Sequence, residues 1–463
     1  MVQKPSIPKG TRDFTPTEVA KRNYIFDCIK RQFQLFGFQP IETPSFENSD
    51  TLLGKYGDEG DRLIFRILNS GDFLNKVKDE TLEAKNSQEV ARLISEKALR
   101  YDLTVPFARY VVMHQNEIDL PFKRYQMQPV WRADRPQKGR FREFYQCDAD
   151  VVGSNSLLQE IELIQLYDAV FSDLKLHGVT IHLNNRKILA GIAEVIGAKD
   201  KLIDFTVALD KLDKIGVHAV KKEMQEKGIS DAALTKLAPL FTIEGTNAQR
   251  LKALGDLLTV SEEGQKGVKE LLFICNALDE IGLQSAKINI NVTLARGLNY
   301  YTGTIIEVAA PAQVAMGAIG GGGRYDDLAG IFGLKDVSGV GISFGLDRIY
   351  LVLEELGLFP NTIAQSLDVL FINFGDKEAM SALKLIKKLR KMGVKADLYP
   401  GNVKVQKQMK YAHNRNLPYV GLIGASELET KSFIIKDMHV GTQKTYLMED
   451  FDAFGHELLT KPV

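Results

Sequence analysis

The stretch Arg140–Asp150 reads RFREFYQCDAD, and residues of different character alternate along most of it. This period of two predicts a β-strand, because successive side chains of a strand point to opposite faces. One face of the predicted strand carries Arg140, Arg142, Phe144, Gln146, Asp148 and Asp150. Guanidinium and carboxylate groups are costly to bury without partners, so this face suits a ligand with phosphates at one end and an amine or ring at the other. An antiparallel sheet with one solvated face has the same pattern.

The segments around this strand predict a sheet-forming chain that is interrupted by helices. A helix is expected to begin at Thr15-Pro16 and to end at Gly37. Between about 186 and 285 nearly every segment has helical periodicity. Apolar residues then alternate with polar ones from Ile288 to Leu294, which returns the chain to sheet. A helical block between two sheet-forming regions indicates an inserted domain.

A last domain boundary is predicted between 360 and 366. Beyond it, strands and helices alternate, which indicates a small α/β domain with a largely parallel sheet. The domain also has basic helical positions, which are the best candidates for contact with a nucleic-acid backbone, although such a run by itself is more often a solvated face. These positions are Lys384, Lys387, Lys388, Arg390, Lys391, Lys404, Lys407 and Lys410.

Composition limits the class of protein without identifying it. The 463 residues contain 59 Lys plus Arg and 59 Asp plus Glu, so a polyanion site must be local rather than a property of the whole surface. The three cysteines lie far apart and match neither a zinc site nor a disulfide framework. The first residues do not resemble a signal peptide, and no apolar run is long enough to span a bilayer. We therefore expect a soluble, cytoplasmic protein, with the highly charged segment 72–96 as a surface excursion.

Further stretches of sequence place arginines beside glycines or aromatic residues. The strand that precedes Arg140–Asp150 is expected to supply Arg132, and residues 295–303 read ARGLNYYTG. Gly320–Gly323 match neither a dinucleotide fingerprint nor a P-loop, so we expect a loop or bulge there, or a close approach of backbone to a ligand. Arg348 falls in the first turn of a predicted helix, where its charge is unfavourable unless an anion or solvent meets it.

This set of arginines suits the joining of a carboxylic acid to ATP. In that reaction two anionic reactants approach each other, and charge builds on the phosphoryl oxygens as pyrophosphate leaves. Arginines remain charged and bind phosphate through a planar fork, so they answer both problems. Preorganised charge of this kind contributes on the order of several kcal/mol per group to catalysis. The reaction requires no nucleophilic side chain and no general base, and the sequence offers no convincing one.

With these motifs in place, the chain resembles the class II aminoacyl-tRNA synthetases and, among them, the histidyl-tRNA synthetases. Residues 36–44 look like motif 1, 132–150 like motif 2 and 341–348 like motif 3. Residues 99–104 and 296–303 are similar to the two signatures of histidyl-tRNA synthetases, and the second is highly specific. Residues 9–14 also match. The resemblance covers nearly the whole chain and is least diagnostic in the helical block.

The resemblance implies a site for ATP. Arg132 would hold the α-phosphate, and Arg140 and Arg348 would hold the γ-phosphate end of a bent ATP molecule. Phe144 would stack on adenine. Arg296 would contact both the carboxylate of the amino acid and the α-phosphate, at a place where related enzymes use a magnesium ion. Mg²⁺ would still bridge the β- and γ-phosphates, and Arg296 and Arg132 would be the catalytic residues.

The resemblance also implies a site for histidine. Its residues would be Asp102, Thr104, Gln146, Asp150, Arg296, Tyr300 and Tyr301. The first three would receive the ammonium group, Asp150 and Tyr301 would hydrogen-bond the imidazole nitrogens, and Tyr300 would line the pocket. Asp102 and Thr104 are expected to share a strand face. The sequence departs from the family pattern at Asn299, Asp134 and Asp102.

The implied architecture is that of a multidomain α/β and α+β protein. A class II antiparallel-sheet catalytic core would comprise residues 1–185 and 287–360, with a helical insertion domain at 186–286 and an α/β anticodon-binding domain at 366–463. The family further implies a homodimer, with tRNA(His) charged at its 3′ end through histidyl-adenylate. Three alternatives are a catalytically silent regulatory subunit of histidine biosynthesis, a module that senses uncharged tRNA, and another ATP-dependent carboxylate ligase. The motif arginines and the extra α/β domain weigh against the first.

Overall fold

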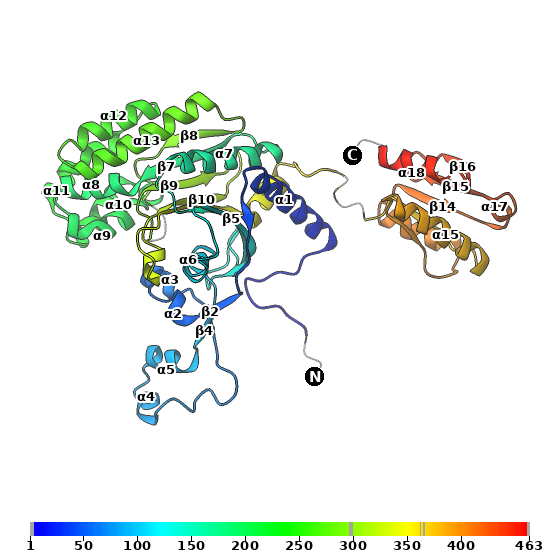
Figure 1. The fold of residues 1–463 in the computed structure, drawn as a ribbon, viewed down its shortest axis with the longest axis horizontal. Coiled ribbons are helices and arrows are strands. Elements are labelled where there is room, and N and C mark those ends of the chain that lie inside the picture. The colour runs from blue at the N-terminus through cyan, green and yellow to red at the C-terminus, as the bar shows by residue number, and fades with distance from the viewer. Residues whose placement is uncertain (1–3, 296–299, 362, 364–365, 461–463) are drawn as a thin grey trace. The chain divides into compact units, whose positions relative to one another are not determined.

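The structure, a computed structural model, describes residues 4–295, 300–361, 363 and 366–460. It divides into two compact units, Met1–Phe359 and Pro360–Val463, which are described separately (Figure 1).

An eight-stranded sheet is the centre of the first unit, with its strands in the order β1-β5-β6-β11-β10-β9-β7-β8. The strands from β5 to β7 in that order pair antiparallel, whereas β1 and β8 join the two edges in parallel. This arrangement confirms the predicted antiparallel-sheet core. The strand bounds are β1 (Gln39–Pro40), β5 (Phe122–Trp131), β6 (Glu143–Val152), β7 (Val179–Asn185), β8 (Ala286–Ile290), β9 (Thr304–Ala309), β10 (Gly320–Tyr325) and β11 (Gly339–Gly345).

Apolar stripes on helices cover this sheet. The helix at the N-terminal end begins where predicted, because the Thr15 hydroxyl accepts from the Glu18 amide and the Glu18 carboxylate accepts from the Thr15 amide. Phe33 on this helix packs its ring 5.2 Å from Tyr125 of β5 and 5.8 Å from Phe344 of β11, measured between ring centroids. The helices packed in this way include α1 (Pro16–Leu35), α7 (Leu158–Asp173) and α14 (Leu346–Glu355).

The predicted helical block lies between β7 and β8, which are parallel neighbours (Figure 1). Parallel neighbours need a long crossover connection, and this block provides one. Its apolar residues belong to the same hydrophobic cluster as those of the large sheet, so the block and the sheet share one core. Its elements are α8 (Arg186–Val195), η1 (Lys199–Lys201), α9 (Leu202–Leu209), α10 (Leu212–Glu226), α11 (Asp231–Leu237), η2 (Ala238–Thr242), α12 (Asn247–Leu257) and α13 (Glu262–Ile281).

A smaller antiparallel sheet, in the order β2-β4-β3, lies at one side of the unit. Figure 1 shows α4 and α5 projecting away from the body, and neither helix has a buried residue, which confirms the surface excursion predicted for 72–96. The remaining elements of the unit are β2 (Phe46–Asn48), α2 (Ser49–Leu52), α3 (Gly57–Asp61), β3 (Arg66–Ile67), α4 (Asp79–Glu83), α5 (Ser87–Ile94), β4 (Lys97–Leu99), α6 (Thr104–Met113) and η3 (Ala329–Phe332).

The structure corrects the expectation for the glycine run. Gly320–Gly323 form neither a loop nor a bulge but the first part of β10, paired with β9 and β11 on its two sides. A Cβ atom at Gly322 would lie 2.1 Å from the carbonyl oxygen of Gly341 on the neighbouring strand. Glycine is required there because the strands approach too closely for a side chain, which a propensity argument does not detect.

Two further local predictions were wrong. Arg140 and Arg142 precede β6, since a turn at Gln137–Arg140 delays the strand until Glu143. Asp102 and Thr104 do not share a strand face, because Thr104 is the first residue of α6. Pro106 explains this start, since proline lacks the N–H that a strand ladder needs but fits the first turn of a helix.

The second unit has a five-stranded sheet in the order β13-β12-β14-β15-β16. The pairings of β12 with β13 and β14 are parallel and the other two are antiparallel, so the sheet is mixed rather than largely parallel. All eight basic positions named above are exposed. The elements are β12 (Val369–Phe371), α15 (Asp376–Lys391), β13 (Ala396–Leu398), α16 (Val405–Asn414), β14 (Tyr419–Leu422), α17 (Ala425–Glu429), β15 (Ser432–Asp437), β16 (Gln443–Leu447) and α18 (Phe451–Thr460).

The three cysteines, Cys28, Cys147 and Cys275, are buried and form no disulfide. Burial raises the pKa of each thiol, well above its ordinary value for Cys147 and to about 12 for Cys275. Within the described residues, no helix combines the length and the apolar character needed to cross a membrane.

The close approach of β10 to β11 leads to a stability prediction. Gly322→Ala should lower the free energy of unfolding by about 3 kcal/mol, because the added methyl group collides with strand backbone that cannot move aside. Gly330→Ala is the matched control, since a Cβ there meets nothing within 4 Å, and it should change stability by less than about 0.5 kcal/mol. Denaturant unfolding followed by circular dichroism measures both, and equal stability of the two variants would contradict the prediction.

Candidate functional site

A cavity of about 500 Å³ opens on the face of the large sheet that the helix α7 does not cover. It brings together every predicted site residue that lies in the described part of the chain. These residues are Asp102, Thr104, Arg132, Arg140, Phe144, Gln146, Asp150, Tyr300, Tyr301 and Arg348. Arg296 and Asn299 lie outside the described residues. The strand parity predicted for Phe144, Gln146 and Asp150 places all three on this face, as expected.

Bare glycine backbone forms part of the cavity floor. Gly320, Gly321 and Gly322 of β10 and Gly341 of β11 line it. A Cβ atom at Gly341 would fall 1.9 Å from Asp150 Oδ1, so the Asp150 carboxylate lies directly over the backbone of its cross-strand partner. The sheet can therefore bring a buried carboxylate and a ligand close to its own main chain.

One end of the cavity is acidic, and Asp102 is part of it. The Tyr56 hydroxyl donates to Asp102 Oδ1 at 2.8 Å, the Val105 amide donates to the same oxygen at 3.2 Å, and the Tyr300 hydroxyl donates to Oδ2 at 3.3 Å. The Val105 contact places the carboxylate at the N-terminal end of α6, where a negative charge is favoured. Burial nevertheless raises the pKa of Asp102.

Asp150 is the second carboxylate at the acidic end. Its Oδ2 lies 2.7 Å from Nη2 of Arg124, the cross-strand partner on β5, and its Oδ1 accepts from the Tyr325 hydroxyl at 2.6 Å. Both members of the ion pair are buried. Burial raises the pKa of Asp150, although the charge of Arg124 opposes the rise.

Asp148 is a third carboxylate in the cavity, which strand parity placed on this face without assigning it a role. It is buried between Gln146 and Asp150 along β6, and its Oδ1 has no hydrogen-bond partner among the described residues. Burial raises the pKa of Asp148 to about 7, and the neighbouring Asp150 contributes to the rise. Its alternation with Gln146 and Asp150 was the sequence signal that could have identified it.

Tyr56, Arg124 and Tyr325 also position the carboxylates of the acidic end, and the sequence patterns did not identify them. Each acts by touching a carboxylate that is distant in sequence: Arg124 and Tyr325 contact Asp150, and Tyr56 contacts Asp102. These contacts depend on strand pairing and on the place of α3 in the fold. No local pattern in the sequence identifies them.

The other end of the cavity is basic. The Arg132 guanidinium donates from Nε to the Tyr101 carbonyl at 3.0 Å and lies 4.2 Å from the Tyr101 ring centroid and 5.2 Å from that of Phe144. Arg348 donates to the carbonyls of Gly139 at 2.8 Å and Ala318 at 2.6 Å. Both guanidinium groups are therefore held in fixed directions by backbone and aromatic contacts.

Asp347, in the first turn of α14, links this end of the cavity to the N-terminal segment. This buried carboxylate pairs with Arg12 at 2.5 Å and with Arg22, and it accepts from the Tyr145 amide at 3.3 Å. Arg12 also lies 3.3 Å from the ring centroid of Phe141, in the segment that precedes β6. Arg140 is held more loosely, with Nη1 3.6 Å from Asp134 Oδ1.

The two ends define what the cavity can bind. Buried carboxylates need a cation or N–H donors, whereas fixed arginines need an anion such as phosphate. Phe144 offers a flat apolar surface beside Arg132, at the basic end. Among the described residues that line the cavity there is no lysine, histidine or cysteine. The arrangement therefore favours chemistry that depends on placing charged groups, rather than on a side-chain nucleophile of these types.

Comparison with known proteins gives consistent results. Residues 72–349 match the family described as Histidyl-tRNA synthetase, and residues 368–455 match the family described as Anticodon binding domain. A relative from Christiangramia forsetii named "Histidine--tRNA ligase" is 68% identical over 458 residues, which cover 99% of this chain and 100% of the relative. A relative of the same name from Flavobacterium johnsoniae is 64% identical, with coverage of 99% and 100%. The crystal structure of histidyl-tRNA synthetase from Nostoc sp. PCC 7120 is 29% identical, has a TM-score of 0.81 and covers 98% of this chain and 100% of its own.

The raised pKa of Asp148 leads to a pH-dependent stability prediction. Between its ordinary value of 3.8 and about 7, the folded chain still binds a proton that the unfolded chain has released, so stability falls as pH rises through this window. Asp148→Asn removes that loss. Relative to the native protein, the free energy of unfolding of the variant should increase by on the order of 1–2 kcal/mol between pH 5.5 and pH 8.

Thermal unfolding at the two pH values measures this gain. Asp327→Asn is the control, because Asp327 is exposed and lies outside the cavity, and its difference from the native protein should be the same at both pH values. A difference for Asp148→Asn that does not depend on pH would contradict the prediction.

Proposed function

This chain belongs to the histidyl-tRNA synthetase family, and from that membership we propose that it activates histidine with ATP and transfers it to the 3′ end of tRNA(His). One observation carries the proposal: a single cavity joins fixed arginines at one end to buried carboxylates at the other. ATP and histidine together require such a pair of ends. Relatives named "Histidine--tRNA ligase", similar over the full length, support the ligase over a silent regulatory subunit.

At the basic end, the proposed ligand is ATP. Arg132 binds the α-phosphate, Arg140 and Arg348 bind the γ-phosphate end, and Phe144 stacks on adenine. The carbonyls that hold Arg348 and the stacking that holds Arg132 support these roles, because a fixed guanidinium loses little freedom when a phosphate arrives. Preorganised charge of this kind lowers the barrier as charge builds on the phosphoryl oxygens.

At the acidic end, the proposed ligand is histidine. Asp102, Thr104 and Gln146 receive the ammonium group, and Asp150 and Tyr301 hydrogen-bond the two imidazole nitrogens, beside Tyr300. A site built in this way leaves polar groups unpaired with any other amino acid. It can therefore reject competitors by roughly 10⁴-fold or more without a separate editing site.

Arg296 is proposed to join the two ends by contacting the histidine carboxylate and the α-phosphate. The attack of one carboxylate oxygen on the α-phosphorus forms histidyl-adenylate and releases pyrophosphate. Arg296 and Arg132 neutralise the charge of this step, so they are the proposed catalytic residues. The part of Arg296 rests on the sequence signature 296–303.

ATP is proposed to enter the cavity as its Mg²⁺ complex. The described residues contain no group of three or more His, Cys, Asp or Glu side chains that could hold a metal ion. The phosphates and water would therefore supply most of its ligands, as is usual for Mg²⁺, and Asp134 and Glu307 are cavity-lining carboxylates that suit it. The bound ion would neutralise charge on the leaving pyrophosphate.

The remaining proposals concern the whole chain. Residues 1–185 and 287–360 form the catalytic core, 186–286 is an insertion domain that contacts the acceptor stem of tRNA, and 366–463 binds the anticodon. The exposed lysines of α15 and α16 support a contact with the tRNA backbone. The protein acts as a homodimer in the cytoplasm, where a reducing environment suits its free thiols.

Histidine-dependent exchange of pyrophosphate into ATP tests the proposed function. The purified protein should support exchange with histidine, and exchange with other amino acids should be about 10⁴-fold slower because the polar groups of the pocket stay unpaired. Absence of exchange with histidine, or equal exchange with several amino acids, would sink the proposal.

Substitution of a single arginine tests its mechanism. Arg132→Ala should lower the rate of exchange by about 10²-fold or more, and Arg296→Ala should do the same. Arg135→Ala is the matched control, because Arg135 is close to Arg132 in the sequence but is exposed and does not line the cavity. It should keep the native rate. Unfolding curves must show that all three variants fold, and a native rate in Arg132→Ala would remove this residue from its role.

A further inference from the structure

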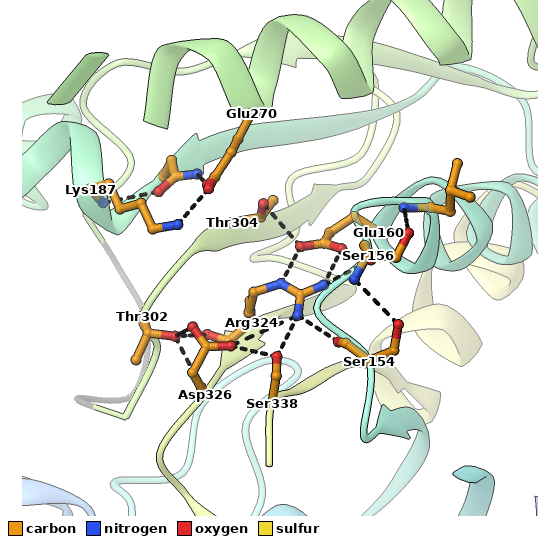
Figure 2. Close-up of polar contacts among 12 residues, drawn as sticks. Ser154, Ser156, Glu160, Lys187, Glu270, Thr302, Thr304, Arg324, Asp326 and Ser338 are labelled. Carbon is orange, nitrogen blue, oxygen red and sulfur yellow. Dashed lines mark hydrogen bonds and ion pairs between the residues drawn. The ribbon is translucent and has the colours of Figure 1, made fainter. Parts of the chain in front are cut away.

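Figure 2 shows a cluster of polar groups that includes Thr302. Thr302 follows Tyr300 and Tyr301 in the chain, but the cluster does not line the cavity. Its centre is Arg324, at the end of β10. The guanidinium binds both carboxylate oxygens of Glu160 on α7, each at 2.6 Å. Both side chains are almost wholly buried.

All five N–H groups of Arg324 have acceptors. Besides the two donated to Glu160, Nη1 donates to the Ser154 carbonyl at 3.0 Å and to the Ser338 hydroxyl at 2.6 Å, and Nη2 donates to the Ser156 carbonyl at 3.1 Å. Since an arginine has five donors in a rigid plane, its position is fully determined. A buried ion pair adds little net stability compared with apolar residues, so orientation is what this pair supplies best.

The cluster continues from Arg324 to Thr302. The Ser338 hydroxyl that accepts from Arg324 donates in turn to Asp326 Oδ1 at 2.5 Å. The Thr302 hydroxyl donates to Asp326 Oδ2 at 2.6 Å and accepts from the Asp326 amide at 3.0 Å. The Thr302 amide donates to the Arg324 carbonyl at 2.8 Å. The Thr302 hydroxyl also lies 3.4 Å from the Arg324 carbonyl, so both the amide and the hydroxyl of Thr302 are held by Arg324 and Asp326.

Thr302 directly follows the two tyrosines of the cavity. The Tyr301 ring covers Gly323, where a Cβ atom would lie 3.0 Å from Tyr301 Cδ1. Tyr300 donates to Asp102 and packs its ring 5.0 Å from that of Tyr301, edge to face. Any displacement of Thr302 would shift both rings relative to the carboxylates at the acidic end.

We propose that Arg324 and Asp326 are positioning residues for the amino-acid substrate: by holding Thr302, they set the place of Tyr300 and Tyr301. The inference rests on the proposed function, in which these tyrosines contact histidine. Neither Arg324 nor Asp326 touches the substrate. Their effect is on how tightly and how selectively histidine binds.

The Thr302 hydroxyl allows a test with little change of shape. Thr302→Val removes the hydroxyl and should raise KM for histidine about tenfold, since two hydrogen bonds to Asp326 are lost, while KM for ATP stays near its native value. Thr302→Ser restores the hydroxyl and should restore KM. An unchanged KM for histidine in Thr302→Val, or a loss of kcat alone, would overturn the proposal, because a merely structural contact would reduce the amount of active protein instead.

A second pair of variants tests the ion pair. Arg324→Lys keeps the charge but loses the fork, so KM for histidine should again rise while KM for ATP does not. Glu162→Gln is the matched control, because Glu162 is on the same helix α7 but pairs outward with Lys123 at 2.6 Å. Its KM for histidine should be native. An equal rise in both variants would show an effect of α7 as a whole and would overturn the proposal.

Hydrogen exchange separates this inference from the proposed function. The Thr302 amide is hydrogen-bonded, so peptides that contain residues 300–303 should exchange faster in Thr302→Val than in the native protein or in Thr302→Ser. Unchanged exchange would overturn the inference even if the native protein activates histidine. Faster exchange in a protein that does not activate histidine would instead overturn the proposed function, while the role of Arg324 and Asp326 in holding Thr302 would stand.

Discussion

The contact of β10 with its two neighbouring strands is the constraint on which the cavity depends. A side chain at Gly322 would meet a carbonyl of β11, and one at Gly341 would displace the carboxylate of Asp150. Without these glycines the sheet could not close at this point, and Asp150 could not lie over its partner strand. This part of the cavity floor is thus main chain, and its shape follows from the pairing of the strands.

The strand β6 connects the two ends of the cavity. Phe144 and Asp150 are six residues apart on this strand, which corresponds to roughly 20 Å along it. That length suits a nucleotide placed end to end with an amino acid. A single extended strand therefore sets the distance between Phe144, beside the arginines, and the carboxylate of Asp150.

Sequence reasoning found the residues whose direction is set locally. Strand parity placed Phe144, Gln146 and Asp150 on one face, and the Thr15 capping box fixed the start of α1. Sequence reasoning failed where the local structure depends on a contact between residues that are far apart in the sequence. The glycines of β10 suggested a loop because the neighbouring carbonyl was unknown, and Arg124 gave no sign of its pairing with Asp150 before the strand register was known. Its assignment of Arg296 concerns a residue outside the described part of the chain.

The buried cysteines can report transient opening of the folded protein. Cys147 lies between Gln146 and Asp148 on β6, so its thiol points into the core on the side of the sheet opposite to the cavity. With its pKa raised well above the ordinary value, it stays protonated and inert while the sheet is closed. An alkylating reagent therefore reaches Cys147 only when the sheet beneath the site opens, and the rate of alkylation measures that opening. The rate of alkylation of Cys275 on α13 measures the opening of the helical block in the same way.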